Sequence, residues 1–128
     1  MKKNVLLVDD DHIFNYLNER IIQKMGFSDE IHSARNGQEA IDLLNQYLSG
    51  TTSLPDIIFL DLNMPVMDGF AFIEAFKRMN MPGKEKISII IVTSSQDPKD
   101  IARAKSLGID HYLTKPITED GIKKALAL

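Results

Sequence analysis

The sequence contains no cysteine and no tryptophan among its 128 residues. The absence of cysteine excludes disulfides, a thiolate nucleophile and Cys-ligated metals, and it fits a reducing compartment. The net charge is only −3, so the chain lacks the basic excess typical of direct nucleic-acid binding. No apolar run approaches the roughly 18 residues of a membrane span. The four apolar residues after Met-Lys-Lys-Asn are too few for a signal peptide. We therefore expect a cytoplasmic protein without a nucleic-acid or membrane partner.

The composition that is present is that of an ordinary globular domain. Hydrophobic residues make up 44% of the chain and charged residues 26%, a balance that favours a folded core over disorder. A length of 128 residues corresponds to one domain and buries enough surface to need no cross-link. We find no internal repeat and no low-complexity tract. The sequence therefore predicts a single domain over residues 1–128.

Short apolar runs alternate with longer amphipathic stretches along the whole chain. The runs at residues 5–8, 57–60 and 87–92 are almost continuously apolar, which is typical of strands buried on both faces in a parallel sheet. Residues 30–34 and 110–114 are weaker strand candidates. Five strands that alternate with five helices predict an α/β doubly wound (βα)5 fold. We expect the flavodoxin-like strand order 2-1-3-4-5, with helices on both faces.

The amphipathic stretches carry recognisable helix signals. In the first, apolar residues recur at every fourth position (Ile13, Leu17, Ile21 and Met25), and Phe14 and Ile22 widen the stripe. This spacing predicts that the stripe faces the core. Gly26 then supplies a helix stop.

Capping residues predict where the later helices begin. Asn36 with Glu39 three residues later resembles a capping box. Asp68 is a candidate cap for the third helix, and Asp97 followed by Pro98 has the order typical of a helix start. Asp11, directly before the first helix, is interpreted as a cap rather than as part of a functional site.

Polar residues follow four of the predicted strands. Asp9 and Asp10 follow the first, Asp61 follows the third, Thr93 ends the fourth and Lys115 follows the fifth. In open α/β sheets, ligands bind at the carboxyl ends of the strands, where the strand order reverses. With strands one and three adjacent, Asp9 and Asp10 are expected to face Asp61.

The chemistry of this set suggests phosphoryl transfer. Three carboxylates in one crevice repel each other and shift their pKa values. Mg²⁺ is a suitable counter-ion because it prefers carboxylate, carbonyl, phosphate and water oxygens. A carboxylate can also attack phosphorus and form an aspartyl phosphate. A neighbouring cation and hydroxyl would stabilise the oxygens of the transferred group.

Four motifs together resemble the receiver domain of two-component response regulators. They are Val-Asp-Asp at 8–10, Leu-Asp-Leu-Asn-Met-Pro-Val-Met-Asp-Gly at 60–69, Val-Thr-Ser at 92–94 and Leu-Thr-Lys-Pro at 113–116. Each follows a predicted strand, and the order and the length of the chain also match. The resemblance, closest to single-domain chemotaxis regulators, covers nearly the whole sequence.

This resemblance implies a role for each site residue. Asp61 is the expected phosphoacceptor. Asp9, Asp10 and Asp61, with the backbone carbonyl of Asn63, are the expected Mg²⁺ ligands. Lys115 is expected to pair with the phosphoryl group.

The resemblance also implies a switch. Thr93 is the hydroxyl expected to move toward the phosphoryl group, and Tyr112 is the expected switch aromatic. Ser94 occupies a position that is usually small and leaves the phosphoryl group accessible. Pro116 is expected to follow Lys115 through a cis peptide bond.

The functional expectation is a phosphorelay response regulator. A sensor histidine kinase or phosphotransfer protein would supply the phosphoryl group, and the chain would catalyse its own phosphorylation and slow dephosphorylation without being a metabolic enzyme. We expect no output domain to follow the receiver, and hence output by docking to another, unidentified protein or by a relay. We expect a monomer or a weak phosphorylation-dependent dimer. Two alternatives remain open: a receiver cut from a longer regulator or hybrid kinase, and a phosphorylation-independent interaction module.

Overall fold

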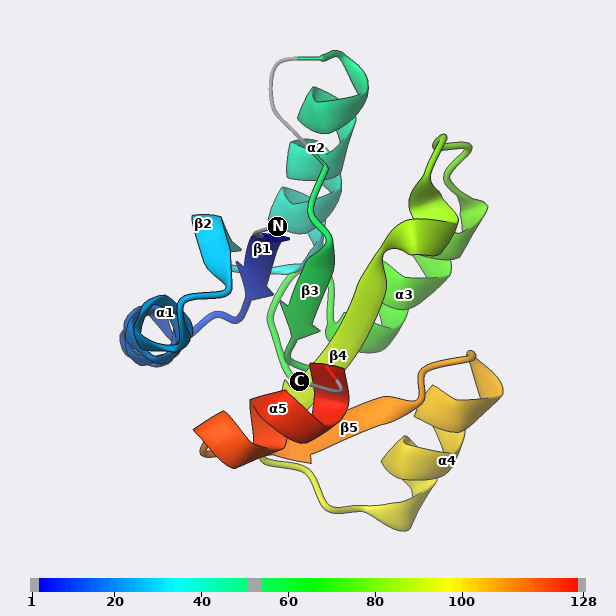
Figure 1. Ribbon diagram of the computed structural model, residues 1–128. Coiled ribbons are helices and arrows are strands. Elements are labelled where there is room, and N and C mark those ends of the chain that lie inside the picture. The colour runs from blue at the N-terminus through cyan, green and yellow to red at the C-terminus, as the bar shows by residue number, and fades with distance from the viewer. Residues whose placement is uncertain (1–2, 51–53, 127–128) are drawn as a thin grey trace.

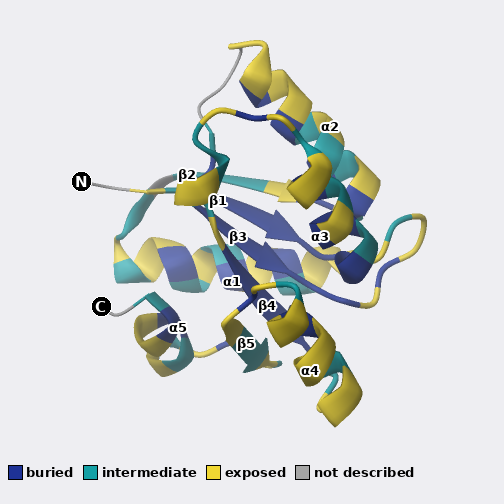
Figure 2. Cartoon of the chain, turned by 90° about the vertical axis from the view of Figure 1, so that its right-hand side faces the viewer, coloured by how far each residue is buried: buried dark blue, intermediate teal, exposed yellow. Residues whose placement is uncertain are grey.

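The computed structural model describes residues 3–50 and 54–126; the remaining parts of the predicted 1–128 domain lie outside the described residues. Its sheet has five parallel strands: β1 (Lys3–Val8), β2 (Ser28–Ala34), β3 (Ile57–Leu60), β4 (Ser88–Thr93) and β5 (His111–Thr114). Their order is β2-β1-β3-β4-β5, which confirms the predicted topology. The central strands are buried on both faces because helices cover each side of the sheet (Figures 1 and 2).

Five α-helices form the two outer layers: α1 (His12–Met25), α2 (Gly37–Leu48), α3 (Gly69–Arg78), α4 (Pro98–Ser106) and α5 (Glu119–Leu126). A short 3-10 helix, η1 (Lys84–Lys86), precedes β4. Helices α1 and α5 pack with one set of strand side chains, including Val5, Leu7 and Ile90. Helices α2, α3 and α4 pack with the opposite set, including Leu6 and Ile58. No helix of the described residues is long and apolar enough to cross a membrane.

The helices begin at the predicted caps. The side chain of Asp11 accepts hydrogen bonds from two backbone N–H groups of α1, and Asn36, Asp68 and Asp97 cap α2, α3 and α4 in the same way. Each cap satisfies a donor that the first turn of a helix leaves unpaired. The predicted capping box of α2 is only half formed, because Glu39 accepts from the backbone of Arg35 instead of that of Asn36.

Helix α1 ends at Gly26 as predicted, with the glycine in the left-handed conformation at φ 73°. Its predicted inward face is only partly correct: Ile22 lies in the core and Phe14, Ile21 and Met25 pack against it, but two residues of the first turns do not. Ile13 and Leu17 are 60% and 52% exposed, whereas Asn15, Asn18 and Ile22 are buried. The helix is therefore rotated so that two asparagines, and not the first two residues of the apolar stripe, face the sheet. The physical reason is that this part of α1 lies beside the polar end of β1, where Asn15 donates a hydrogen bond to the backbone oxygen of Asp9.

The parallel register brings the strand ends together at one edge of the sheet. Val8 pairs with Leu60, so the residues that follow them, Asp9 and Asp61, are neighbours. Thr93 pairs with Thr114, which places Lys115 next to the end of β4. After Asp61 the chain turns back sharply, and a Cβ atom on Gly69 would collide with the backbone oxygen of Asp61. Glycine is therefore required where α3 begins.

Candidate functional site

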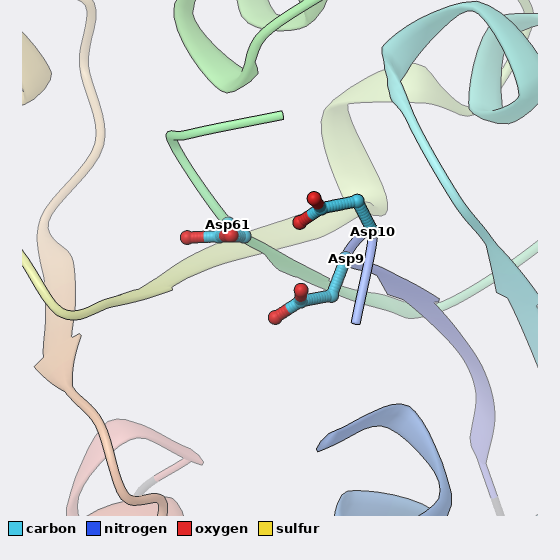
Figure 3. Close-up of side chains that lie close together, drawn as sticks. All are labelled: Asp9, Asp10 and Asp61. Atoms are coloured by element: carbon cyan, nitrogen blue, oxygen red, sulfur yellow. The ribbon is translucent and has the colours of Figure 1, made fainter. Parts of the chain in front are cut away.

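Three carboxylates form the centre of the candidate site. Asp9 and Asp10 follow β1, and Asp61 follows β3; each contributes an oxygen to a cluster in which all three atoms lie within 4.8 Å of one another. Figure 3 shows the side chains extending from the two adjacent strand ends. Asp9 and Asp61 are only 4% and 5% exposed, whereas Asp10 is exposed. The cluster thus combines two buried acids with one acid that is open to solvent.

Burial dominates the electrostatics of the two inner acids. Loss of hydration raises the pKa of Asp61, and the negative charge of Asp9 raises it further; Lys115 and hydrogen bonds from Asn63 and Thr93 act in the opposite direction. Burial also raises the pKa of Asp9, against the lowering effect of Lys115. Ionisation of both acids is therefore less favourable than that of ordinary carboxyl groups, and a bound cation would stabilise their charged forms.

Lys115 supplies the positive charge of the site. Its Nζ atom lies 2.8 Å from Oδ2 of Asp9 and 3.5 Å from Oδ2 of Asp61. The same atom lies 4.2 Å from the ring centroid of Phe14, within the range of a cation–π contact. Burial alone would lower the pKa of Lys115, but the hydrogen bond to Asp9 and the charges of both acids raise it above its usual value. The lysine is thus held as a cation, closer to Asp9 than to Asp61.

Thr93 and Tyr112 lie on the side of the site that faces α4. Thr93 is fully buried, and its hydroxyl accepts a hydrogen bond from the backbone N–H of Ser95 at 3.3 Å. Tyr112 is half-buried, and its hydroxyl donates to the backbone oxygen of Ser95 at 3.0 Å. The side chain of Ser95 in turn hydrogen-bonds with Asp100 of α4. Ser95 therefore connects the predicted switch residues with α4.

The remaining predicted residues lie around the rim. Asn63 is exposed, and its backbone N–H donates to the Asp61 carboxylate. Ser94 is exposed directly after Thr93. Pro116 follows Lys115 through a cis peptide bond, as the resemblance implies.

Two contacts of the site were not predicted from the sequence. Phe14 was placed in the apolar stripe of α1, but its ring lies against the Lys115 ammonium. Asn15 was not singled out, yet its side-chain amide donates to the backbone oxygen of Asp9 at 2.9 Å. A polar residue inside an amphipathic helix, shortly after the acidic strand end, was the available signal for Asn15.

The donor set of the acidic cluster suits a hard divalent cation. Asp9, Asp10 and Asp61 offer converging carboxylate oxygens, which are the ligands that Mg²⁺ and Ca²⁺ prefer. Burial raises the pKa of both Asp9 and Asp61 although Lys115 acts to lower it, so a cation beside them would stabilise their charged forms. The acidic pocket could therefore bind a metal ion.

The fold and the site together define a doubly wound protein with an acid, hydroxyl and lysine cluster at its switch point. The family model for the response regulator receiver domain matches residues 5–127. The chain belongs to this family and is a receiver domain of two-component signalling.

Individual relatives agree with this assignment. The chain is 32% identical to sporulation initiation phosphotransferase F of Bacillus subtilis, with 98% of this chain and 92% of that protein covered. It is 31% identical to a probable chemotaxis protein CheY of Rhizobium etli, with coverage of 98% and 90%. A two-component response regulator from Cytophaga hutchinsonii has the same fold, with a TM-score of 0.88, 37% identity and coverage of 99% and 96%.

Proposed function

We propose that this receiver domain accepts a phosphoryl group on Asp61, in a reaction that requires Mg²⁺. The donor is a phosphohistidine of a sensor histidine kinase or phosphotransfer protein, with both partners in the cytoplasm. The observation that carries the proposal is the convergence of Asp9, Asp10 and Asp61 within 4.8 Å, with the Lys115 ammonium 3.5 Å from Asp61. A nucleophilic carboxylate, a metal-binding acid pair and a fixed cation are the groups that phosphoryl transfer needs.

The residues divide the chemistry among themselves. A carboxylate oxygen of Asp61 attacks phosphorus, and the P–O bond forms while the P–N bond to the donor imidazole breaks; the imidazole leaves with the bonding electron pair. Asp9, Asp10, Asp61 and the backbone carbonyl of Asn63 would hold Mg²⁺, which would supply positive charge against the carboxylates and the phosphoryl oxygens. Water later attacks the same phosphorus and releases phosphate, so the modification is temporary.

Lys115 has a specific part in this scheme. In the structure its ammonium is closer to Asp9 than to Asp61. A phosphoryl group on Asp61 adds oxygens that carry more negative charge than a carboxylate. We expect Lys115 to pair with one of these oxygens and the Thr93 hydroxyl to donate to another, while the exposed position of Ser94 leaves room for water.

The signal then reaches the surface through β4 and β5. When Thr93 moves toward the phosphoryl group, it vacates space that the ring of Tyr112 can enter. This movement breaks the hydrogen bond from Tyr112 to the backbone of Ser95 and so alters the connection to α4. A local charge change thereby changes the surface formed by α4, β5 and α5, which is the proposed docking surface for an output protein.

The surface of α1 supports a donor protein that docks beside the site. Ile13, Tyr16 and Leu17 are more than half exposed, although large apolar side chains usually gather inside a protein. They lie on the helix that follows Asp9 and Asp10. Contiguous exposed apolar residues are typical of protein–protein contacts. We propose that the phosphodonor covers this face during transfer.

Receivers of this length occur both alone and as parts of longer proteins. The match covers 92% of the Bacillus subtilis phosphotransferase but only 7% of hybrid signal transduction histidine kinase L of Dictyostelium discoideum. For the receiver itself we propose a monomer or a weak phosphorylation-dependent dimer. The chemistry at Asp61 is the same in either arrangement.

The proposal is tested with a small phosphodonor such as acetyl phosphate and intact-mass spectrometry. We expect one added phosphoryl group in the presence of Mg²⁺ and none when EDTA is present. Asp61→Asn should remain unmodified, because an amide cannot form the acyl phosphate. Asp110→Asn is the matched control, since Asp110 is an exposed aspartate that directly precedes β5 at the opposite edge of the sheet. Equal modification of Asp61→Asn would contradict the assignment, and an unmodified wild type would favour a phosphorylation-independent interaction module.

A further inference from the structure

A small cavity lies directly beneath the acidic cluster, between α1 and the sheet. Its volume is about 10 Å³, close to the minimum that holds one water molecule. The lining combines the acids Asp9 and Asp61, the amides Asn15 and Asn18, and apolar side chains such as Phe59 and Val92. The cavity is therefore lined by both polar and apolar groups.

Two buried carbonyl oxygens on the α1 side of this cavity have no hydrogen-bond partner among the described residues. They are Oδ1 of Asn15 and Oδ1 of Asn18, in side chains whose residues are only 7% and 3% exposed. The Nδ2 group of Asn15 donates to the backbone oxygen of Asp9 at 2.9 Å, so the orientation of this amide is fixed and its oxygen is the free atom. A buried acceptor without a donor is costly and unusual in a folded protein.

The chemistry of the lining identifies what fits. Both free atoms are acceptors, so the occupant must donate at least two hydrogen bonds. A water molecule has two donors, is neutral and matches the volume.

We propose that one ordered water molecule occupies this cavity and donates hydrogen bonds to the Oδ1 atoms of Asn15 and Asn18. The water joins the two asparagines into one unit. Because Asn15 also donates to the backbone of Asp9, this unit forms the floor of the acidic site. Asn18 is thereby a positioning residue for Asp9, although it does not touch the carboxylates through any hydrogen bond found among the described residues.

The positioning effect rests on the proposed function, in which Asp9 is a metal ligand. Groups that hydrogen-bond to a metal-ligating residue, without contacting the metal themselves, contribute substantially to metal affinity. If the water is lost, Asn15 loses the partner of its oxygen and is free to rotate, and the backbone of Asp9 loses a fixed donor. We therefore expect the site to bind Mg²⁺ more weakly without the water, while the carboxylates themselves remain in place.

The first experiment locates the water. We expect a high-resolution crystal structure of the wild-type chain to show one water within hydrogen-bond distance of both Oδ1 atoms. Asn18→Leu, which removes the acceptor and fills the space with methyl groups, should lose it. Asn45→Leu is the control, because Asn45 is an exposed asparagine in helix α2, and it should keep the water. An empty cavity in the wild type, or a cation in place of the water, would overturn the proposal. This outcome is read from the wild-type structure alone and does not depend on the folding of a variant.

The second experiment measures the Mg²⁺ dissociation constant by titration, followed through the backbone amide NMR signals of residues 9–11. We expect Asn18→Leu to raise this constant about 10-fold and Asn45→Leu to leave it unchanged. Asn18→Ser keeps an oxygen acceptor and leaves room for a second water, so it should restore most of the affinity. Unchanged affinity in Asn18→Leu would contradict the positioning role. A wild type that binds no Mg²⁺ would instead contradict the proposed function and leave the crystallographic result standing.

Discussion

The central feature at the residue scale is the uneven sharing of one lysine between two buried acids. Lys115 lies 0.7 Å closer to Asp9 than to Asp61, since the two distances are 2.8 and 3.5 Å. The negative charge of Asp9 is therefore better neutralised by the lysine than that of Asp61. This leaves the carboxylate of Asp61, the expected nucleophile, more of its negative charge with which to attack phosphorus. Besides the two acids, the ring of Phe14 also contacts the ammonium of Lys115. A metal ion that takes Asp9 as a ligand would free Lys115 for the phosphoryl group.

The raised pKa of Asp61 has a consequence for stability in the absence of metal. A carboxyl group with a raised pKa in the folded state binds its proton more tightly than the unfolded chain does. Its stabilising effect is thus complete below the unfolded value of 3.8 and is lost as the pH rises through the raised folded value. Each unit of difference corresponds to about 1.4 kcal/mol.

We therefore expect Asp61→Asn to be more stable than the wild type at neutral pH in EDTA. The advantage should be on the order of 1 kcal/mol and should shrink toward zero as the pH is lowered to about 4. Urea unfolding of both proteins across this range measures the difference, in which the contributions of the unchanged titrating groups largely cancel. An advantage that grows toward acid pH would show that the pKa of Asp61 is lowered by folding.

The identities of the site residues were predictable, but their surroundings were not. Asp9, Asp61, Thr93 and Lys115 each follow or end a strand, so the sequence placed them at one edge of the sheet once the strand order was assumed. The preference of Lys115 for Asp9 and its contact with Phe14 depend on side-chain conformations across three elements. No spacing along the chain encodes such distances.

At the scale of the elements, helix α1 shows where periodicity is insufficient. Residues 15, 18, 22 and 25 share a helical spacing just as 13, 17, 21 and 25 do, but the former set contains two asparagines, so apolar periodicity favours the latter set. The choice between them depends on the neighbour of the first two turns, which is the polar end of β1 rather than its apolar middle. Asn15 and Asn18 are accordingly buried, and Ile13 and Leu17 are exposed. Elsewhere, the strands and the N-cap residues followed local rules and were predicted correctly, except that Glu39 does not close the capping box of α2.

The connection between Thr93 and α4 yields a prediction for the switch. We expect Thr93→Ala to leave phosphorylation of Asp61 largely intact, because the nucleophile, acid pair and lysine remain. The change should uncouple the site from the surface, since the hydroxyl that responds to the phosphoryl group is missing. Amide NMR shifts with and without beryllofluoride, a phosphoryl mimic, measure the coupling.

The expected pattern in this experiment is specific to one segment. In Thr93→Ala, shifts near residues 9–11 and 61–63 should persist, whereas those from residues 101 to 112 should be strongly reduced. Shifts of wild-type size throughout that second segment would rule out the assigned coupling through Thr93 and Tyr112. Loss of all shifts would instead place Thr93 in the binding of the mimic itself.

At the scale of the whole molecule, the site is built at the cost of stability in the metal-free protein. Three carboxylates converge at the point where the strand order reverses, and the folded chain holds them together although they repel each other. The apolar strands and the two helical layers offset this cost. Fold class and topology were predictable because buried strands, helix caps and alternation all indicate the same architecture.

This balance predicts that Mg²⁺ stabilises the fold. A ligand that binds only the native state raises the free energy of unfolding by RT ln(1 + [L]/Kd), about 2.7 kcal/mol at 100 times Kd. In a domain of this size that corresponds to an increase of about 10 °C in Tm. Thermal melts of the wild type with Mg²⁺ and with EDTA measure the shift, and equal Tm values at saturating Mg²⁺ would argue against a metal site.

Asp10→Asn should stabilise the metal-free protein but reduce the stabilisation that Mg²⁺ provides. Removal of one negative charge relieves repulsion within the cluster, so the metal-free variant should melt about 2–4 °C above the metal-free wild type; the effect is modest because Asp10 is exposed and its charge is screened. The variant also lacks one of three carboxylate ligands, so Mg²⁺ should stabilise it less than it stabilises the wild type. The two Tm values are therefore expected to reverse their order when Mg²⁺ is added. A general effect of surface charge would raise the Tm of Asp10→Asn equally in both conditions, whereas a metal site formed with Asp10 requires the reversal.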